Sequence, residues 1–189
     1  MSVRLSEFAP NIKIERELFE FVEEGRLDQA VLDLVLPNER PREYETVLWD
    51  YKRKLPNTSG KYIEGGDEPN EEEVCQIIKD VVSFYNSYGG YIVGGIDEFK
   101  DSPLRGCENS RRFAFRIDKL NERLESYTRA KIQCRFEKFN LGPNADTCVG
   151  LLYVPRRSSS LPVARFVKGS PEKTGKQIFK NPIIPLTHV

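Results

Sequence analysis

Residues 70–98 read NEEEVCQIIKDVVSFYNSYGGYIVGGIDE, and their pattern indicates a helix followed by a buried strand. Asn70 with Glu73 three positions later is typical of a helix start, because each side chain can accept a backbone N–H of the first turn. Apolar residues then recur three and four apart as one stripe: Val74, Ile77, Ile78, Val81, Val82 and Tyr85. Gly89 and Gly90 end this helix, and the apolar run at 91–96 predicts a short strand. This order predicts an α/β class of domain.

The residues before this stretch predict a helical hairpin and then a strand. Between 11 and 35, apolar side chains recur three and four apart on both sides of Gly25. Pro37 and Pro41 end that pattern, residues 45–53 alternate like a strand, and the polar residues 57–69 are typical of a loop. We therefore expect an N-terminal helical segment over residues 1–42.

The residues after this stretch predict a second helix and three strands. Residues 110–127 carry another apolar stripe, and residues 130–138 alternate, with Ile132, Cys134 and Phe136 facing inward. Cys148–Val154 is apolar on both faces, which predicts a central strand, and residues 163–168 can add one more. Together these elements predict a single compact α/β (α+β) domain over residues 43–180, with a mixed β-sheet and packed helices, followed by a tail at 181–189.

Composition limits the classes of function. At 189 residues the chain has the length of one ordinary domain. No apolar run approaches the ~20 residues of a membrane span, and the charged N-terminus is unlike an export signal, so we expect a cytoplasmic protein without a membrane partner. The four cysteines stand far apart and His188 is the only histidine, which disfavours a zinc cage and histidine-based catalysis. Any chemistry then depends on carboxylates and lysine.

The net charge of zero hides an asymmetry between the two halves of the chain. Residues 1–100 hold 12 Lys and Arg against 21 Asp and Glu, whereas residues 101–189 hold 17 against 8, so the halves carry −9 and +9. Such a chain can gather carboxylates around a metal and offer its basic half to phosphates. Alternatively, the two halves attract each other or their charges are simply solvated.

Two acidic segments are candidates for a metal site. Asp50 and Lys52 are two residues apart in a predicted strand, so they share a face, as a metal ligand and a phosphate-facing cation must. Asp97 and Glu98 follow the next predicted strand. Glu45 has the opposite parity and joins them only if the strand begins after it or contains a bulge. The alternative is an ordinary turn and a common surface spacing.

The wider pattern resembles one family. From Glu45 the chain reads E-x4-D-x-K-R-x-L-P, then IIKDVVSFYNSYGG, then YIVGGIDE, then Y-V-P ahead of A-R-F-V-K-G. This order of motifs resembles the Schlafen-type AlbA-like domain, a nucleic-acid-handling module, over roughly residues 43–180. The resemblance implies a metal-dependent endonuclease that cleaves RNA, with structured RNA such as tRNA as the expected substrate.

The resemblance also implies which residues carry the reaction. Glu45, Asp50 and one of Asp97 and Glu98 would hold Mg²⁺ or Mn²⁺, with Glu98 in the better register, and Lys52 would face the scissile phosphate. Asp50 stands where the family commonly has glutamate. Relatives with two copies of this lobe surround one substrate, so a homodimer or a larger parent protein would supply the second wall here. A non-catalytic nucleic-acid-binding or regulatory module of a larger defence or transcription protein is the alternative, and a protein-interaction domain is a third.

Basic residues in the second half are candidates for phosphate contacts. Four of them are spaced to share one face of the helix predicted at 110–127: Arg112, Arg116, Lys119 and Arg123. Arg156, Arg157, Arg165 and Lys168 stand near predicted strand ends and add to this set. The alternative for the helix is a solvated face with local ion pairs to neighbouring acidic residues. Residues 169–176 (GSPEKTGK) have the wrong glycine spacing for a P-loop, so we expect no bound NTP.

Overall fold

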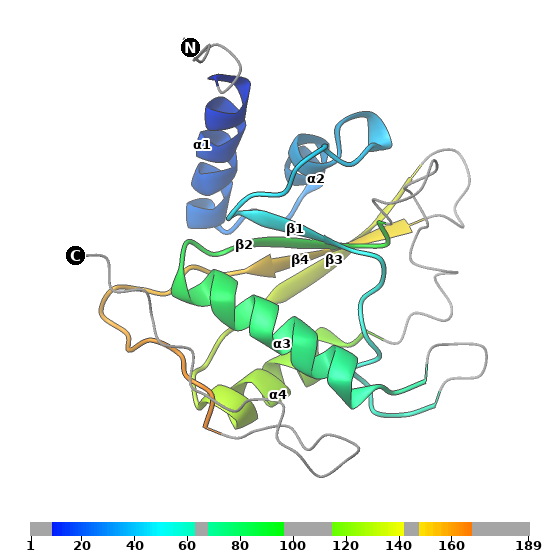
Figure 1. The fold of residues 1–189 in the computed structure, drawn as a ribbon, viewed down its shortest axis with the longest axis vertical. Helices are drawn as coiled ribbons and strands as arrows, with labels where there is room; N and C mark the ends of the chain where they lie inside the picture. Colours follow the sequence, from blue (N-terminus) through cyan, green and yellow to red (C-terminus); the bar gives the residue numbers. More distant parts are fainter. Residues whose placement is uncertain (1–8, 63–67, 97–114, 142–147, 168–189) are drawn as a thin grey trace, which may run out of the picture.

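The computed structural model describes residues 9–62, 68–96, 115–141 and 148–167, and Figure 1 shows their arrangement. The helices are α1 (Ala9–Glu24), α2 (Gln29–Val35), the short 3-10 helix η2 (Pro37–Glu39), α3 (Glu71–Asn86) and α4 (Ile117–Thr128). The strands are β1 (Trp49–Lys52), β2 (Gly90–Gly94), β3 (Arg135–Asn140) and β4 (Cys148–Val154). Within these ranges, every helix is too short or too polar to cross a membrane.

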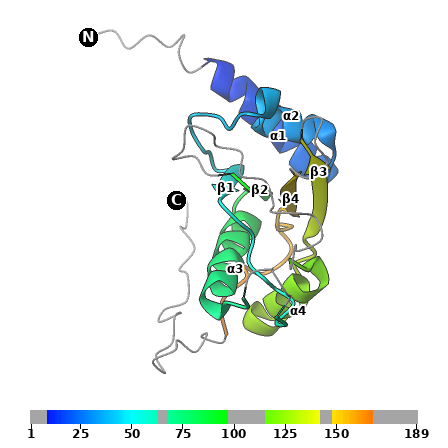
Figure 2. The same ribbon diagram turned by 90° about the vertical axis from the view of Figure 1, so that its right-hand side faces the viewer.

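A four-stranded sheet forms the middle layer, in the order β1-β2-β4-β3. β1 and β2 are parallel and are connected through α3, whereas β4 is antiparallel to both of its neighbours. Figures 1 and 2 show α1 and α2 on one face of the sheet and α3 and α4 on the other. The mixed sheet with packed helices confirms the predicted single α/β (α+β) domain.

Alternating side chains along the strands build a core on each face of the sheet. On β2, Tyr91 and Val93 pack with the α1–α2 hairpin, whereas Ile92 packs with α3 and α4. Every residue of β4 is buried, because this strand lies between β2 and β3 with helices over both faces. The prediction that Cys148–Val154 is a central strand is therefore confirmed.

The predicted N-terminal helical hairpin is also present. Gly25 follows α1 with a φ of 65°, a left-handed conformation that glycine adopts at little cost. Asp28 then caps α2, because its Oδ1 accepts hydrogen bonds from Ala30 N at 3.0 Å and Val31 N at 3.3 Å. The hairpin packs its apolar side on the sheet and covers the face that holds Tyr91.

The second predicted helix begins later than expected. Residues 115 and 116 lie outside it, and α4 starts at Ile117. Thr58 explains this start, because its Oγ1 accepts Arg116 N at 2.6 Å and donates to Arg116 O at 2.9 Å. The side chain of the buried Thr58 thereby holds Arg116 in an extended conformation, with φ −123° and ψ 113°.

Two predicted strands also differ from the structure, because a distant side chain again bonds backbone groups that a strand would use. β3 begins at Arg135 instead of residue 130, because the side chain of Asn121 bonds both backbone groups of Cys134, each at 3.0 Å. Residues 163–167, the described part of the strand predicted at 163–168, form no strand. There the side chain of Asn86 bonds both backbone groups of Ala164, each at 2.9 Å.

Two smaller differences concern the ends of elements. β1 covers only Trp49–Lys52 of the run predicted at 45–53. Asn70 begins α3 as predicted, but its side chain accepts Glu72 N at 3.1 Å and not the N–H of Glu73. The carboxylate of Glu73 pairs instead with Lys54, at 3.1 Å.

The turn between α3 and β2 provides a test of the fold. Gly90 has a φ of 149°, and a Cβ added there would lie 2.5 Å from Leu48 O and 2.7 Å from a ring carbon of Phe84. Strain and overpacking together predict that Gly90→Ala lowers the free energy of unfolding by about 2–4 kcal/mol, measured by urea denaturation. Gly60→Ala is the matched control, since its φ is also positive but its nearest neighbour is the Arg123 side chain at 3.8 Å. Equal losses in the two variants would contradict this account.

Candidate functional site

Strand β1 presents Asp50 and Lys52 toward α3. Trp49 and Tyr51 alternate with them and are buried against the α1–α2 hairpin. Because β1 is an edge strand, the two polar side chains are only partly covered, with 20% of Asp50 and 29% of Lys52 exposed. The two side chains thus share a face, as the Asp-x-Lys spacing predicts.

The ammonium group of Lys52 lies between two carboxylates. Its Nζ is 2.5 Å from Asp50 Oδ2 and 3.0 Å from Asp80 Oδ2, and Asp80 belongs to α3. Gln76, one turn earlier on α3, donates from Nε2 to Asp80 Oδ1 at 3.0 Å and orients that carboxylate. Burial lowers the pKa of Lys52, but the hydrogen bonds and charges of Asp50 and Asp80 together raise it above its ordinary value. Lys52 is therefore a fixed cation at neutral pH.

Glu45 reaches the same place from the loop before β1. The strand begins only at Trp49, so the parity that would direct Glu45 to the other face does not apply. Glu45 Oε1 accepts Tyr51 N at 2.5 Å and satisfies a backbone donor on the free edge of the sheet. Burial and then a hydrogen bond with the Glu45 side chain raise the pKa of Asp50 to about 6, against the opposing effect of Lys52. Glu45 and Asp50 are thus direct neighbours.

The two parallel strands end together at this site. Lys52 is the last residue of β1, and its carbonyl oxygen accepts Gly95 N at 2.9 Å and Ile96 N at 3.1 Å, just after β2. Asp97 and Glu98 follow Ile96 in the chain, but they lie outside the described residues.

The donor chemistry of the site fits a hard divalent cation. Glu45 and Asp50 supply carboxylate oxygens, the ligands that Mg²⁺ and Mn²⁺ prefer. In the part of the chain that the structure describes, no group of three or more His, Cys, Asp or Glu side chains is arranged to hold a metal ion. The predicted set therefore depends on Glu98, or on Asp97 in its place, as its third ligand.

Asp80 is not among the site residues that the sequence pattern predicts. The sequence feature that could have indicated it is its position in α3: Asp80 lies at the edge of the apolar stripe, beside Val81 and four residues after Gln76. A helix that connects two parallel strands packs over their sheet, so a polar residue at this border can meet polar residues of the first strand. Asp80 approaches Lys52 only because α3 packs on β1, and the sequence pattern does not specify that packing.

A pocket of about 230 Å³ adjoins this cluster, between the end of β1 and α3. Three consecutive cations of the chain leaving β1 line one side of it: Lys52, Arg53 and Lys54. Polar side chains of α3 line the other side: Glu73, Gln76 and Asp80. The pocket therefore lies beside the carboxylates, but its surface is mainly apolar, because the side-chain stems line it together with Pro56 and Ile77.

Two of the four basic residues predicted on the helix at 110–127, Lys119 and Arg123, lie on α4. Arg116 precedes α4, and Arg112 lies outside the described residues. The remaining members are held in ion pairs: Arg116 with Asp118 at 3.2 Å, Lys119 with Glu122 at 2.7 Å, and Arg123 with Glu71 at 2.6 Å. This arrangement is the alternative that the sequence left open, a helix surface with local ion pairs.

Arg156 and Arg157 lie at the opposite end of the sheet from Lys52. The register pairs Gly94 with Gly150 and Gly90 with Val154, so the end of β4 meets the beginning of β2. Four residues at ~3.3 Å each separate the two ends by roughly 13 Å. Arg165 is exposed in the segment that follows, and Lys168 lies outside the described residues. The structure thus separates Arg156 and Arg157 from the carboxylates.

Comparison with known proteins identifies the family. A family model described as Schlafen, AlbA_2 matches residues 45–180. Because this match covers more than half of the chain, the chain belongs to the Schlafen AlbA_2 family. No curated protein gives a significant match to the chain. The predicted resemblance is therefore confirmed, and family membership indicates a function that involves nucleic acid.

One pair of hydrogen bonds joins two of the sequence motifs that carry the resemblance. The Asn86 of the FYN sequence in α3 bonds Ala164 of the late A-R-F-V-K-G sequence, each partner contributing a donor and an acceptor. Two motifs that are 78 residues apart are therefore parts of one contact.

Proposed function

We propose that the chain is a metal-dependent endonuclease that cleaves RNA, with structured RNA such as tRNA as its substrate class. Glu45, Asp50 and Glu98, or Asp97 in place of Glu98, would hold Mg²⁺ or Mn²⁺. When bound, such an ion activates water and stabilises the charge that develops on the phosphate. Lys52 provides a fixed positive charge for the same phosphate.

The observation that carries this proposal is the pairing of Asp50 with Glu45 at the joint end of β1 and β2. Burial and the second carboxylate raise the pKa of Asp50 although the Lys52 ammonium lies 2.5 Å away, so a divalent ion would favour its charged form further. Such an ion would also relieve the repulsion between the two carboxylates. The basic residues Lys52, Arg53 and Lys54 follow one another beside this place and would meet the phosphate backbone.

A second candidate function is a non-catalytic nucleic-acid-binding or regulatory module of a larger defence or transcription protein. The position of Lys52 favours it, because the ammonium group already neutralises Asp50 and Asp80. In this alternative, the cluster stabilises the fold, and the basic residues alone bind nucleic acid.

Incubation of the purified protein with a tRNA pool, with Mn²⁺ and with EDTA, separates these candidates. The endonuclease produces discrete fragments only with Mn²⁺, and Mn²⁺ also raises the melting temperature, since a ligand of the native state shifts unfolding by mass action. RNA binding with neither cleavage nor stabilisation by Mn²⁺ supports the binding module. The same assay with single-stranded and duplex DNA tests the preference for RNA.

A further inference from the structure

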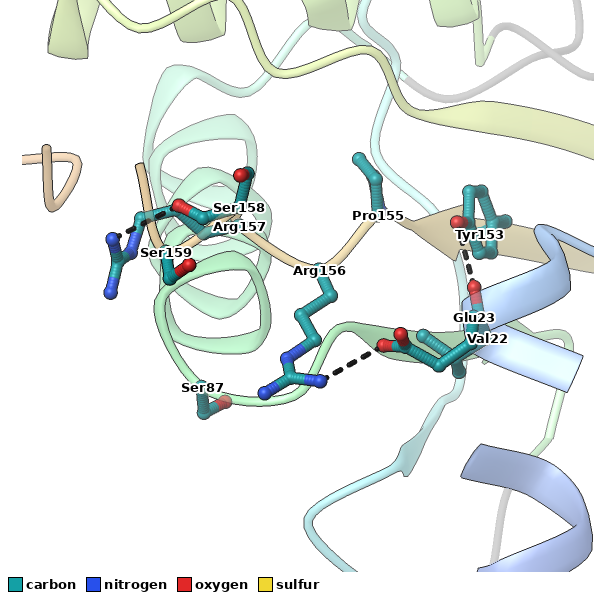
Figure 3. A pocket seen from close by; sticks show the side chains of 9 residues that line it. All are labelled: Val22, Glu23, Ser87, Tyr153, Pro155, Arg156, Arg157, Ser158 and Ser159. Carbon is teal, nitrogen blue, oxygen red and sulfur yellow. Dashed lines mark hydrogen bonds and ion pairs between the residues drawn. The ribbon is translucent and has the colours of Figure 1, made fainter. Parts of the chain in front are cut away.

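A second pocket, which is mainly polar, lies at the far end of the sheet, between α1, the C-terminus of α3 and the chain that leaves β4. Its volume is about 480 Å³, twice that of the pocket beside Lys52. Figure 3 shows the residues that line it: Val22, Glu23, Ser87, Tyr153, Pro155, Arg156, Arg157, Ser158 and Ser159. The proposed endonuclease site uses none of the space in this pocket.

Arg156 extends across this pocket in a defined position. One of its nitrogens, Nη1, is 3.1 Å from Glu23 Oε1, and its guanidinium lies 5.4 Å from the centre of the Phe19 ring. In Figure 3 the guanidinium lies between Glu23 and Ser87. An arginine has five N–H donors in a planar fork, so this single ion pair leaves most of them available to an anion.

Arg157 has a different role, because it shapes the loop. Its backbone N–H donates to Tyr85 O at 3.0 Å, and its Nη1 donates to Ser158 O at 3.2 Å and also to Leu161 O. Ser158 and Ser160 bond each other at 2.9 Å. These contacts engage the Arg157 side chain and the Ser158 hydroxyl within the turn, whereas Arg156 and Ser159 line the pocket beside them.

An aromatic surface borders the pocket. Tyr88 follows Ser87, is 43% exposed, and packs edge-on against Phe19 with 6.4 Å between ring centres. Phe19 therefore contacts both Tyr88 and Arg156. A cation beside an exposed aromatic ring is the combination that binds single strands, in which the phosphate meets arginine and the base stacks on the ring.

We propose that this pocket binds a nucleotide segment of single-stranded nucleic acid, with a phosphate on Arg156 and Ser159 and a base stacked on Tyr88. This inference rests on the nucleic-acid binding in the proposed function and is independent of the metal and of cleavage. Because about 13 Å separates the two ends of the sheet, a strand that contacts both ends must cross that distance.

The Glu23 carboxylate would compete with a phosphate for Arg156, so variants of both residues test the proposal in opposite directions. Arg156→Ala is expected to weaken binding of a labelled 12-nucleotide RNA roughly ten-fold in EDTA, measured by fluorescence anisotropy, and to reduce the salt slope by about one. Tyr88→Ala is expected to cost roughly five-fold or more for the single strand and much less for a duplex of equal length. Glu23→Gln is expected to strengthen binding several-fold.

Matched controls separate the pocket from a general effect of charge. Arg40→Ala removes an exposed arginine after η2, and Glu20→Gln removes an exposed carboxylate one turn before Glu23 on α1. The proposal is overturned if Arg156→Ala matches Arg40→Ala, if Glu23→Gln matches Glu20→Gln, or if the wild type does not bind RNA. Circular dichroism confirms that each variant is folded.

The proposal of an endonuclease and the proposal of a nucleotide-binding pocket can be contradicted independently. If Mn²⁺ produces no cleavage but the variants change the affinity for RNA as expected, the proposed pocket is supported and the proposed endonuclease is abandoned. If cleavage occurs, Arg156→Ala should raise KM for long RNA with kcat unchanged, because it removes binding that is equal in the ground and transition states. An unchanged KM would overturn the pocket and leave the endonuclease intact.

Discussion

Replacing Asp50 by Asn is expected to abolish Mn²⁺-dependent cleavage while making the metal-free protein more stable. The variant keeps the shape of the side chain but loses a carboxylate of the metal site, so we expect activity to fall at least about 100-fold. It also loses the stabilisation by Mn²⁺ that the wild type shows. Activity on tRNA and the melting temperature with and without Mn²⁺ measure the two effects.

The gain in stability follows from the raised pKa of Asp50. The pKa is about 6 in the folded protein against an ordinary value of 3.8, so the folded state binds the proton more tightly than the unfolded state. The free energy of unfolding of the metal-free wild type should therefore fall as the pH rises from about 4 to about 6, with no further loss from this group above that range. Asp50→Asn lacks this loss and should be about 1–3 kcal/mol more stable at pH 7.

Asp118→Asn is the control for this effect. Desolvation raises the pKa of Asp118, but the hydrogen bond and charge of Arg116 outweigh it and leave the pKa below its ordinary value. Removing that carboxylate should therefore leave stability unchanged or slightly reduced at pH 7. If Asp50→Asn is also less stable than the wild type at pH 7, Asp50 has a structural role and the proposed metal site loses its main support.

Replacing Lys52 by Met is expected to have the opposite effect on stability. Methionine retains the unbranched stem but leaves Asp50 and Asp80 as two half-buried carboxylates without their shared cation. We expect the metal-free protein to lose about 1–3 kcal/mol at pH 7, less than for a fully buried pair because the group is partly solvated. Mn²⁺ should raise the melting temperature more in this variant than in the wild type, since no ammonium group competes with it for the carboxylates.

Cleavage by the Lys52→Met variant should remain low even with saturating Mn²⁺, because the phosphate loses its fixed positive charge. Lys54→Met is the matched control, since Lys54 pairs with Glu73 at 3.1 Å in a more exposed position. Its loss of stability should stay below about 1 kcal/mol. If the two lysine variants behave alike, or if Lys52→Met cleaves RNA normally, Lys52 does not act on the phosphate.

Local sequence patterns were sufficient to predict most of the elements. The stripe in α3 repeats with the period of a helix, because its buried side chains lie on one face. The unbroken apolar run of β4 fits a strand that is buried on both faces. The same local reasoning placed Asp50 and Lys52 on one face of β1. The predicted contributions of Asp97, Glu98, Arg112 and Lys168 remain predictions, since these residues lie outside the described ranges.

Element boundaries required the tertiary structure. Thr58, Asn86 and Asn121 each use one side chain to bond both backbone groups of a residue between 13 and 78 positions away. At Arg116, Ala164 and Cys134, these bonds take the place of the backbone hydrogen bonds of a helix or strand. The local pattern of apolar residues does not change at these positions. A method that reads only neighbouring residues therefore extends the helix and the strands beyond their true ends.

The chain's sequence by itself determined the composition of the candidate site, namely carboxylates beside a lysine on one strand, because strand parity is a local property. Only the tertiary structure decided which groups meet it. Packing of α3 on β1 places Asp80 against Lys52, and the start of β1 at Trp49 leaves Glu45 free to reach Asp50. The antiparallel pairing of β4 carries Arg156 to the opposite end of the sheet. These distances depend on strand order and direction, which are set by the burial of the whole core and not by any short stretch of sequence.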